Sequence, residues 1–392
     1  MCLRAVSLAA DDITAIMNGT RFAIFLTVVL SIWGLVHLYV FWRLATVPWF
    51  QAHCSRRALV VAGVGLWLSY VLARVVASWQ WTVLAYPLEF FAATWMGVLF
   101  ITFAVLLTVD VVTFGGAVVG ERAPQIRGWA VAAAVGLSIL AMIQGLRAPE
   151  ITRHEVTLPG LPEELEGMTL VAVSDLHLGR LIGERWLARR VEQINALEPA
   201  IVVAVGDVLD GSANHVEPLI PLLAAIRAPK GVWAVSGNHE FYVGLESSVQ
   251  VLEMAGWRVL RDESAEVAPG LILAGVDDLT ARPKLEANPS PLQTALCYRP
   301  DGATILLSHS PMQAEVAAAF GVGLMLSGHT HAGQIWPFNH LVALRYPLIS
   351  GQYVVDGMQV IVCRGTGTWG PPMRLWQRGE ILHITLRSTS SG

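Results

Sequence analysis

Four long apolar stretches dominate the first part of the chain. They cover residues 22–42, 58–79, 92–112 and 128–146, and each is long enough for a helix that crosses a bilayer core, which takes about 20 residues. The first stretch lacks a small-x-small cleavage site and three more follow it, so we interpret it as a membrane span rather than a signal peptide. The pattern predicts an all-α membrane domain over residues 1–148, and the true start of the chain is either Met1 or Met17.

The pattern changes after residue 148. Short apolar runs typical of strands then alternate with amphipathic segments typical of helices, which indicates an α/β domain over residues 149–392. We expect strands at residues 168–173, 200–205, 231–235, 271–275, 304–307, 322–326, 358–363 and 380–386, and helices at residues 182–196, 216–226 and 246–255.

Composition supports this division into a membrane part and a water-soluble part. Only 14% of the 392 residues are charged and 54% are hydrophobic, whereas charged residues make up about a quarter of a typical soluble domain. The first 150 residues hold nine of the 26 Lys and Arg but only six of the 30 Asp and Glu, so the second part is acidic. An acidic domain argues against nucleic acid as a partner, because that binding needs basic patches.

The four cysteines, Cys2, Cys54, Cys297 and Cys363, have no CxxC spacing. They therefore indicate neither a zinc knuckle nor a disulfide scaffold. Cys297 and Cys363 could pair in an oxidising compartment, but two free core thiols are the favoured interpretation.

Charges in the loops indicate the orientation of the membrane domain. Loops one and three carry Arg43, Arg56, Arg57, Arg122 and Arg127, whereas loop two has no Lys or Arg. The positive-inside rule then favours cytoplasmic loops one and three. We accordingly expect a multi-pass protein of the cell membrane whose α/β domain lies on the non-cytoplasmic side.

Two charged residues lie inside the apolar stretches. Arg74 and Asp110 are each within a turn or two of a stretch end, where a side chain can reach the interface at low cost. An ion or proton path is the alternative, but we interpret the four spans as an anchor.

Polar residues follow five of the predicted strands in the α/β domain. They are Asp175, His177, Asp207, Asn238, His239, His309, His329 and His331. In an open α/β sheet the ligand site lies outside the carboxyl ends of the strands, so these residues are expected to meet. Taken singly, Asp175 or Asp207 could cap a helix, Asn238 could be a turn residue and His309 could be a core histidine. Their shared position at strand ends favours one common site.

The residue types in this set favour metal. Without His239, the set offers seven nitrogen or oxygen donors and no cysteine, which suits two divalent ions that share a carboxylate. Two such ions can bind a phosphate between them and activate a water. His239 directly follows Asn238, which predicts a place at the rim and a role as general acid toward the leaving group.

The composite pattern resembles the signature of the calcineurin-like metallophosphoesterases over about residues 165–386. The matching motifs are Asp175-x-His177, Gly206-Asp207, Gly237-Asn238-His239-Glu240, His309 and Gly328-His329-x-His331. The segment from Arg364 to Leu375, together with Gly333-Gln334-Ile335, is similar to the YkuE-like branch, which includes membrane-attached proteins. Ala332 and Gly379 depart from the usual pattern of that branch, at positions outside the ligand set.

The resemblance implies a four-layer αββα sandwich with a dinuclear metal centre. It assigns Asp175, His177, Asp207 and His331 to one ion, and Asp207, Asn238, His309 and His329 to the other, so that Asp207 bridges the two. Manganese is the favoured metal, and iron or zinc would also fit this donor set.

The sequence as a whole predicts a membrane-anchored phosphoesterase that hydrolyses a phosphodiester or a phosphomonoester by metal-activated water, with His239 as general acid. A lipid-linked substrate is an option because the anchor would hold the site near the bilayer. Arg364 and Arg374 are candidates for binding substrate phosphate, since an Arg fork matches phosphate oxygens; a structural ion pair explains both equally well. The alternative function is a membrane transporter or sensor whose phosphoesterase-like domain binds metal or ligand without catalysis. The sequence does not indicate an oligomeric state.

Overall fold

The computed structural model describes residues 23–24, 27–78, 82–211, 213–282 and 290–389, so that Met17 lies outside the described part. The chain separates into two compact units, Met1–Ser138 and Ile139–Gly392. The division falls inside helix α5, which runs over Ala123–Leu146, and not after residue 148, where the sequence pattern changes. The last turns of α5 belong to the second unit because they bind its C-terminal segment, with the Arg374 N–H donating to the Ala141 carbonyl at 2.9 Å.

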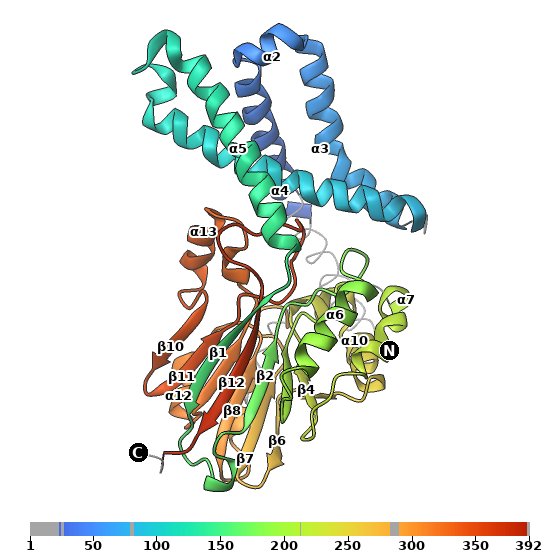
Figure 1. Cartoon of the computed structure of the whole chain (residues 1–392), viewed down its shortest axis with the longest axis vertical. Coiled ribbons are helices and arrows are strands. Elements are labelled where there is room, and N and C mark those ends of the chain that lie inside the picture. The colour runs from blue at the N-terminus through green and yellow to red at the C-terminus, as the bar shows by residue number, and fades with distance from the viewer. Residues whose placement is uncertain (1–22, 25–26, 79–81, 212, 283–289, 390–392) are drawn as a thin grey trace, which may run out of the picture. The chain divides into compact units, whose positions relative to one another are not determined.

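Four helices of the structure are long and apolar enough to cross a membrane, as the sequence predicts: Thr27–Leu44, Arg56–Val76, Val83–Val112 and Gly120–Leu146. They correspond to the first described helix, to α3 (Arg56–Ser78), to α4 (Thr82–Val112) and to α5 with a short helix before it. Smaller helices lie between them: α2 (Pro48–His53), η1 (Phe114–Gly116) and η2 (Gly120–Arg122). Figure 1 shows α3, α4 and α5 by label.

The third of these helices starts at Thr82 rather than at residue 92, where the sequence predicts the start of the span. Its first turns contain Pro87 and Glu89, which interrupt the apolar pattern. Glu89 accepts a hydrogen bond from Arg74 at 3.2 Å, so that the charge is paired within the first unit. Paired polar residues thus allow the helix to extend beyond the apolar stretch.

A cluster of charged residues joins three helices of the first unit. Asp110 of α4 lies 2.5 Å from the Nε atom of Arg43 and 3.1 Å from a terminal nitrogen of Arg127, and it accepts a hydrogen bond from the Tyr39 hydroxyl at 2.6 Å. The two arginine side chains are only 12% and 7% exposed. This arrangement gives Asp110 the structural role of a shared counter-charge.

We predict that Asp110→Ala destabilises the first unit strongly. It leaves the buried charges of Arg43 and Arg127 without their carboxylate, and breaking a buried ion pair costs about 3–5 kcal/mol. The matched control is Arg74→Ala, which removes a side chain that is 66% exposed and should cost about 1 kcal/mol or less. Thermal unfolding of the full chain in detergent measures both, and equal midpoints for the two variants would contradict the prediction.

The second unit contains two six-stranded sheets. The first has the strand order β1-β12-β2-β3-β4-β5 and the second has the order β10-β11-β9-β8-β7-β6. The strands of the first sheet are β1 (Glu150–Thr157), β12 (Glu380–Arg387), β2 (Thr169–Val173), β3 (Ile201–Val205), β4 (Val232–Val235) and β5 (Arg258–Val259). Those of the second are β10 (Gly351–Val355), β11 (Met358–Val362), β9 (Leu324–Ser327), β8 (Ala303–Ser308), β7 (Leu271–Val276) and β6 (Glu263–Ala268).

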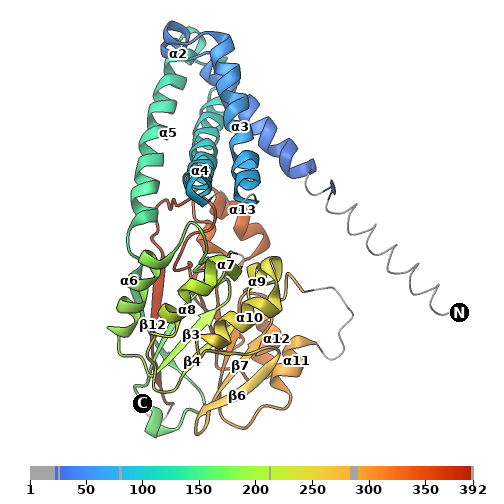
Figure 2. The same cartoon turned by 90° about the vertical axis from the view of Figure 1, so that its right-hand side faces the viewer.

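Alternating side chains of these strands fill three layers of core. Leu170 and Ala172 of β2 face a core shared with the second sheet, whereas Val171 and Val173 face the helices outside the first sheet. Those helices include α6 (Glu184–Asn195), α8 (Ile220–Leu223) and α10 (Leu245–Met254), and the second sheet is covered by α11 (Pro291–Leu296) and α12 (Ala314–Ala319). Figure 2 shows α6 and α8 on one side of the sheets and α11 and α12 on the other. The predicted four-layer αββα sandwich is confirmed.

All eight predicted strands are present, and the differences lie at edges and in helices. The predicted helix over residues 216–226 is broken into α7 (Ala213–Val216), η4 (Glu217–Leu219) and α8, because Pro218 and Pro221 cannot continue the hydrogen-bond ladder. The strands β1, β5, β6 and β10 were not predicted. Neither were the short helices η3 (Glu163–Leu165), α9 (Asn238–Val243), α11, α12, η5 (His331–Gly333) and α13 (Phe338–Arg345). Cys297 and Cys363 are free as expected, but Cys297 is exposed and therefore not a core thiol.

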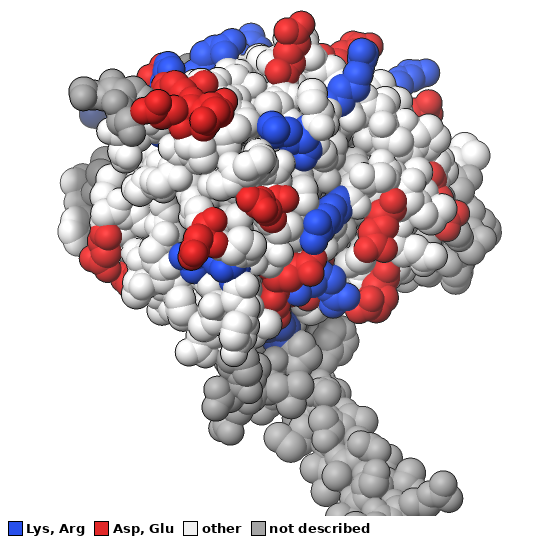
Figure 3. Space-filling view, turned by 90° about the horizontal axis from the view of Figure 1, so that it is seen from below, with Lys and Arg blue, Asp and Glu red and all other residues white. Residues whose placement is uncertain are grey.

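The surface of the second unit mixes charges of both signs. The face shown in Figure 3 carries Lys and Arg side chains beside Asp and Glu side chains. Several form ion pairs, such as Arg387 with Glu155 at 3.0 Å and with Glu166 at 3.1 Å. Such a mixture is typical of a domain surface in contact with water.

Candidate metal centre

The carboxyl ends of strands from both sheets meet at one edge of the sandwich. Strands β2, β3 and β4 run parallel in the first sheet, and β8 and β9 run parallel in the second. The residues that follow them include all seven predicted metal ligands: Asp175, His177, Asp207, Asn238, His309, His329 and His331. The structure places six of these residues in two groups of potential ligand atoms, and Asn238 contacts one of the groups.

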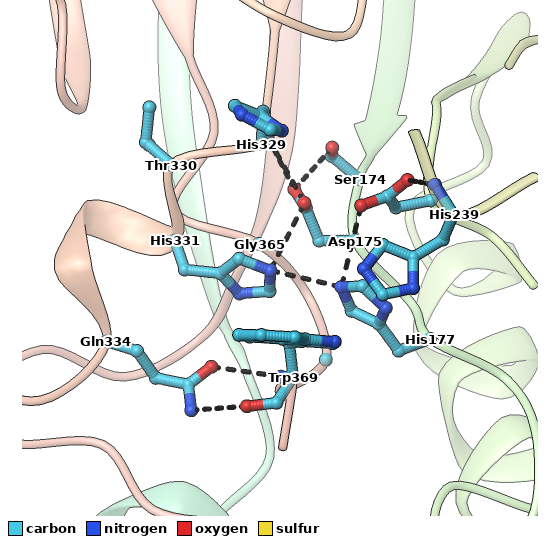
Figure 4. A network of polar contacts seen from close by, with 12 residues as sticks. Ser174, Asp175, His177, His239, His329, Thr330, His331, Gln334, Gly365 and Trp369 are labelled. Atoms are coloured by element: carbon cyan, nitrogen blue, oxygen red, sulfur yellow. Dashed lines mark hydrogen bonds and ion pairs between the residues drawn. The ribbon is translucent and has the colours of Figure 1, made fainter. Parts of the chain in front are cut away.

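The first group consists of Asp175, His177 and His331, which are all buried. The Nε2 atoms of His177 and His331 lie 3.1 Å apart, and the Nε2 of His331 lies 3.3 Å from an Asp175 carboxylate oxygen. Figure 4 shows the two imidazoles and this carboxylate pointing toward one another. Three possible ligand atoms therefore converge on one point.

The second group consists of Asp207, His309 and His329. The Nε2 of His309 lies 3.2 Å from Oδ2 of Asp207, and the Nδ1 of His329 lies 2.8 Å from Oδ1 of Asn238. The same Asp207 oxygen lies 3.8 Å from Nε2 of His177 in the first group. Asp207 is therefore located between the two groups, as a bridging ligand would be.

Five of the seven residues have a backbone conformation that side chains normally avoid. Their φ angles are positive: 55° for Asp175, 48° for His177, 51° for Asp207, 69° for His329 and 49° for His331. Each such residue costs about 1–3 kcal/mol and persists only where the surroundings enforce it. Their concentration at one sheet edge indicates a functional site, since strained residues cluster where function requires them.

Two glycines of the motifs are explained by close approach of the chain. A Cβ atom at Gly237 would overlap the carboxylate of Asp207, and one at Gly328 would overlap the hydroxyl of Ser174. That hydroxyl donates to Asp175 Oδ2 at 2.6 Å, so space at Gly328 allows Ser174 to orient the carboxylate. The glycines thus let the strand ends approach one another.

One ring nitrogen at the site suits a metal ion in particular. The His309 Nδ1 lies 2.7 Å from the Val205 carbonyl, to which its N–H can donate, so that Nε2 faces the Asp207 carboxylate at 3.2 Å. Among the described residues, this Nε2 is one of the buried side-chain atoms without a hydrogen bond. Buried polar atoms are normally satisfied, and a histidine that binds metal through one nitrogen normally donates the other N–H to a carbonyl or carboxylate. The residues therefore fit divalent ions.

The electrostatic environment favours the metal-binding forms of Asp207, His329 and His331. Burial, followed by the charge of His309, lowers the pKa of His329 to about 4. Burial and the neighbours His177 and Arg374 hold the pKa of His331 well below its usual value. Burial alone would raise the pKa of Asp207, but His309 and His177 outweigh it and lower that pKa strongly. Neutral imidazole and ionised carboxylate are the forms that bind a metal. Burial raises the pKa of Asp175, and the charge of Asp207 outweighs burial and raises the pKa of His309, so a metal would displace protons from these two.

His239 lies next to the first group and faces a carboxylate that the sequence analysis missed. Its Nδ1 is 2.8 Å from Oδ1 of Asp210, and His177, Asp210 and His239 form a third cluster of possible ligands. Burial would lower the pKa of His239, but the hydrogen bond to Asp210 and the charge of Asp207 outweigh it and raise that pKa. Asp210 lies three residues after Asp207, and this spacing was the only signal of its role.

Glu240 organises the loops beneath the centre. Its carboxylate accepts hydrogen bonds from the backbone N–H groups of Asp207 at 3.0 Å, Leu209 at 2.9 Å and Gly237 at 2.7 Å. Burial and the charge of Asp207 nevertheless raise the pKa of Glu240. The sequence motif contains Glu240, but sequence reasoning gave it no role, because these partners are set by the contact between the ends of β3 and β4.

The two candidate phosphate-binding arginines have other partners. Arg364 lies 2.6 Å from Glu150 and 2.8 Å from Glu380, so it forms the ion pair that the sequence left open. Arg374 is buried, and it donates to the carbonyls of Arg364 at 2.9 Å and Gly367 at 2.7 Å. Arg364 thus links its own turn to β1 and β12, and Arg374 holds the carbonyls of that turn and of His331 together. A role in phosphate binding stays a prediction for each.

We predict that Glu240→Ala destabilises the second unit by at least about 3 kcal/mol. The substitution leaves three buried N–H groups without an acceptor, and each such group costs about 1–3 kcal/mol. Glu246→Ala on α10 is the matched control, because its side chain is 80% exposed and pairs with Arg261, and it should cost about 1 kcal/mol or less. Calorimetric unfolding of the full chain in detergent compares the two, and a control as unstable as Glu240→Ala would refute this role.

Comparison with known proteins agrees with this geometry. The sequence profile of the calcineurin-like phosphoesterases matches residues 168–333. A protein of Danio rerio called transmembrane protein with metallophosphoesterase domain is 34% identical, over 64% of this chain and 60% of its own length. The chain therefore spans less than two thirds of this relative and of its Bos taurus counterpart, of which it also covers 60%.

Two bacterial relatives are matched along most of their length. An uncharacterized metallophosphoesterase of Aquifex aeolicus is 34% identical, over 60% of this chain and 91% of its own length. The uncharacterized metallophosphoesterase YkuE of Bacillus subtilis is 31% identical, over 62% of this chain and 86% of its own length. With the αββα fold and the cluster of His, Asp and Asn side chains at its strand ends, the chain belongs to the calcineurin-like metallophosphoesterase family.

Proposed function

We propose that this protein is a membrane-anchored, dinuclear metal-dependent hydrolase of phosphate esters, acting on a phosphodiester or a phosphomonoester. The observation that carries the proposal is the convergence of seven residues with nitrogen or oxygen donors at one sheet edge, with Asp207 between the two groups and 3.2 Å from the buried Nε2 of His309. Manganese is the metal we favour. The α/β domain would lie on the non-cytoplasmic side, as the arginines at positions 43–57 and 122–127 indicate by the positive-inside rule, although Arg43 and Arg127 lie within helices and pair with Asp110.

Different residues of the protein would bind each of the two ions at this centre. Asp175, His177 and His331 would hold one ion, Asn238, His309 and His329 the other, and Asp207 would bind both. Two divalent ions, when bound, supply a nucleophile by lowering the pKa of water, and they neutralise charge on the phosphate oxygens. Ser174 and Glu240 keep the ligands in place through their hydrogen bonds to Asp175 and to the backbone of Asp207.

His239 is the candidate general acid. The hydrogen bond from its Nδ1 to Asp210 orients the ring and leaves Nε2 as the atom that can donate a proton to the leaving oxygen. Such proton transfer contributes about 10²–10⁴-fold to a rate, and more for a poor leaving group than for a good one. Asp210 would act as a positioning residue that fixes the ring of His239.

We predict that the full chain in detergent loses phosphoesterase activity on chelation and regains it with manganese. Asp207→Asn should reduce activity with a chromogenic nitrophenyl diester or monoester to the background level, because it weakens the binding of both ions. A chain that binds two metal ions per molecule and hydrolyses neither ester would contradict the proposal and favour the non-catalytic, ligand-sensing alternative. The faster of the two esters identifies the substrate class.

We further predict that His239→Ala acts through the leaving group. The loss in kcat should be about tenfold with a nitrophenyl ester and at least about 100-fold with an alkyl ester, whose leaving oxygen needs a proton. His154→Ala on β1 is the control, since its ring contacts Gln352 at 3.2 Å and lies outside the ligand groups. An equal loss with both esters would rule out the general-acid role of His239.

A further inference from the structure

Exposed apolar side chains gather on one set of connected segments beside the candidate metal centre. We call them the rim face: Trp336, Phe338, Leu341, Leu344, Trp369 and Trp376. Each is at least 40% exposed, and Leu344 reaches 83%. Helix α13 carries three of them and has no buried residue. Large exposed apolar groups in one area mark an interaction site.

The rim face is tied directly to the centre. Tyr346, at the end of α13, places its hydroxyl 2.8 Å from Nε2 of His329. Gln334 accepts from the backbone N–H of Trp369 and donates to its carbonyl, both at 3.0 Å, as Figure 4 shows. The ring of Trp369 lies 5.8 Å from that of His239. A molecule that covers the rim face would therefore lie next to His239 and His329.

The rim face is also tied to the end of a membrane-spanning helix. The Leu375 N–H donates to the Gln334 carbonyl at 3.0 Å, and the Trp376 N–H donates to the Gln144 side chain of α5 at 2.9 Å. Gly145 of α5 lies so close to Pro372 and Met373 that an added Cβ would overlap them. These α5 residues lie in the second unit and near the end of the span candidate Gly120–Leu146. The segment that holds Trp369 and Trp376 is thus fixed to the end of the span candidate Gly120–Leu146.

The conformation and the exposure of Trp376 favour a location at a membrane surface. Its φ angle is 78°, a left-handed conformation that is rare for a bulky residue, yet the side chain is 56% exposed. Burial in the protein core does not explain why a tryptophan is held there. Tryptophan favours the membrane–water interface, where one part of the ring contacts lipid and its N–H contacts water.

We infer that the rim face rests on the bilayer surface and that the substrate is a phosphate ester carried by a lipid. The inference rests on the proposed function and specifies its substrate class. The apolar groups of α13 and the two tryptophans would enter the interfacial layer, while the metal centre beside them faces the head groups. A lipid phosphate could then reach His239 without leaving the membrane.

Lipid contact can be tested without activity. A photoreactive benzophenone amino acid is placed at position 344 in the full chain, which is reconstituted in nanodiscs of phosphatidylcholine and phosphatidylglycerol. Position 254 on α10 is the matched control, because Met254 is 63% exposed and is not part of the rim face. We expect lipid adducts at position 344 at least about tenfold above those at position 254. Equal adducts at both positions, or protein–protein adducts alone at position 344, would overturn the inference.

The substrate class is tested with two esters of the same nitrophenyl leaving group, a soluble diester and a nitrophenyl ester of phosphatidic acid in the nanodiscs. Leu341→Ser with Leu344→Ser, and Trp376→Gly alone, should lower hydrolysis of the lipid ester about tenfold and change that of the soluble ester less than twofold. Glycine adopts the φ of Trp376 freely, so this variant removes the side chain without straining the fold. Met254→Ser with Val354→Ser is the control and should change neither rate.

The outcomes separate the inference from the proposed function. Hydrolysis of the soluble ester but not of the lipid ester by the unmodified chain would overturn the inference and leave the phosphoesterase intact. Equal losses on both esters in the rim-face variants would also overturn it, because they would indicate damage to the centre. Failure of the manganese-loaded chain on both diesters would overturn the inference, and failure on the soluble monoester as well would refute the proposed function.

Discussion

The site depends on a constraint of the backbone, namely that the chain turns into a left-handed conformation directly after buried parallel strands. Asp175, Asp207 and His329 all follow this rule, with φ angles between 51° and 69°. A strand that continued straight would carry these side chains past the edge of the sheet. The turn directs these side chains toward one another. The left-handed conformation costs about 1–3 kcal/mol per residue, which the packing of the sandwich offsets. Each group combines residues that follow β2 or β3 of one sheet with residues that follow β8 or β9 of the other, so the same packing sets the distances within each group.

The fold was predictable in its centre and less so at its edges. Central strands such as β3 and β8 are buried on both faces, so they appear in the sequence as continuous apolar runs. The edge strands β1 and β10 alternate exposed and half-buried residues, and that pattern resembles an extended loop. The break before α8 could be read from Pro218 and Pro221. Contacts that tie the end of α5 to the C-terminal segment join residues more than 200 positions apart, and no local pattern indicates them.

The meeting of the seven candidate ligands at one sheet edge was predictable because each follows a strand, and strand ends are visible in a sequence. The supporting residues were not. Asp210 and Glu240 act through backbone and ring contacts that depend on how the loops after β3 and β4 pack together. Arg374 was considered for substrate, yet burial and four carbonyl partners give it a structural place. A charged residue in a turn carries the same sequence signal whether it faces a ligand or the chain.

The most direct test of the central claim is electron paramagnetic resonance of the full chain, stripped of metal and titrated with manganese. Two ions that share Asp207 at a separation of about 3.5–4 Å should give a spin-coupled signal at two equivalents. Asp207→Asn should give only uncoupled manganese, while Glu246→Ala leaves the coupled signal unchanged. A single uncoupled ion in the unmodified chain, at any manganese concentration, would contradict a dinuclear centre bridged by Asp207.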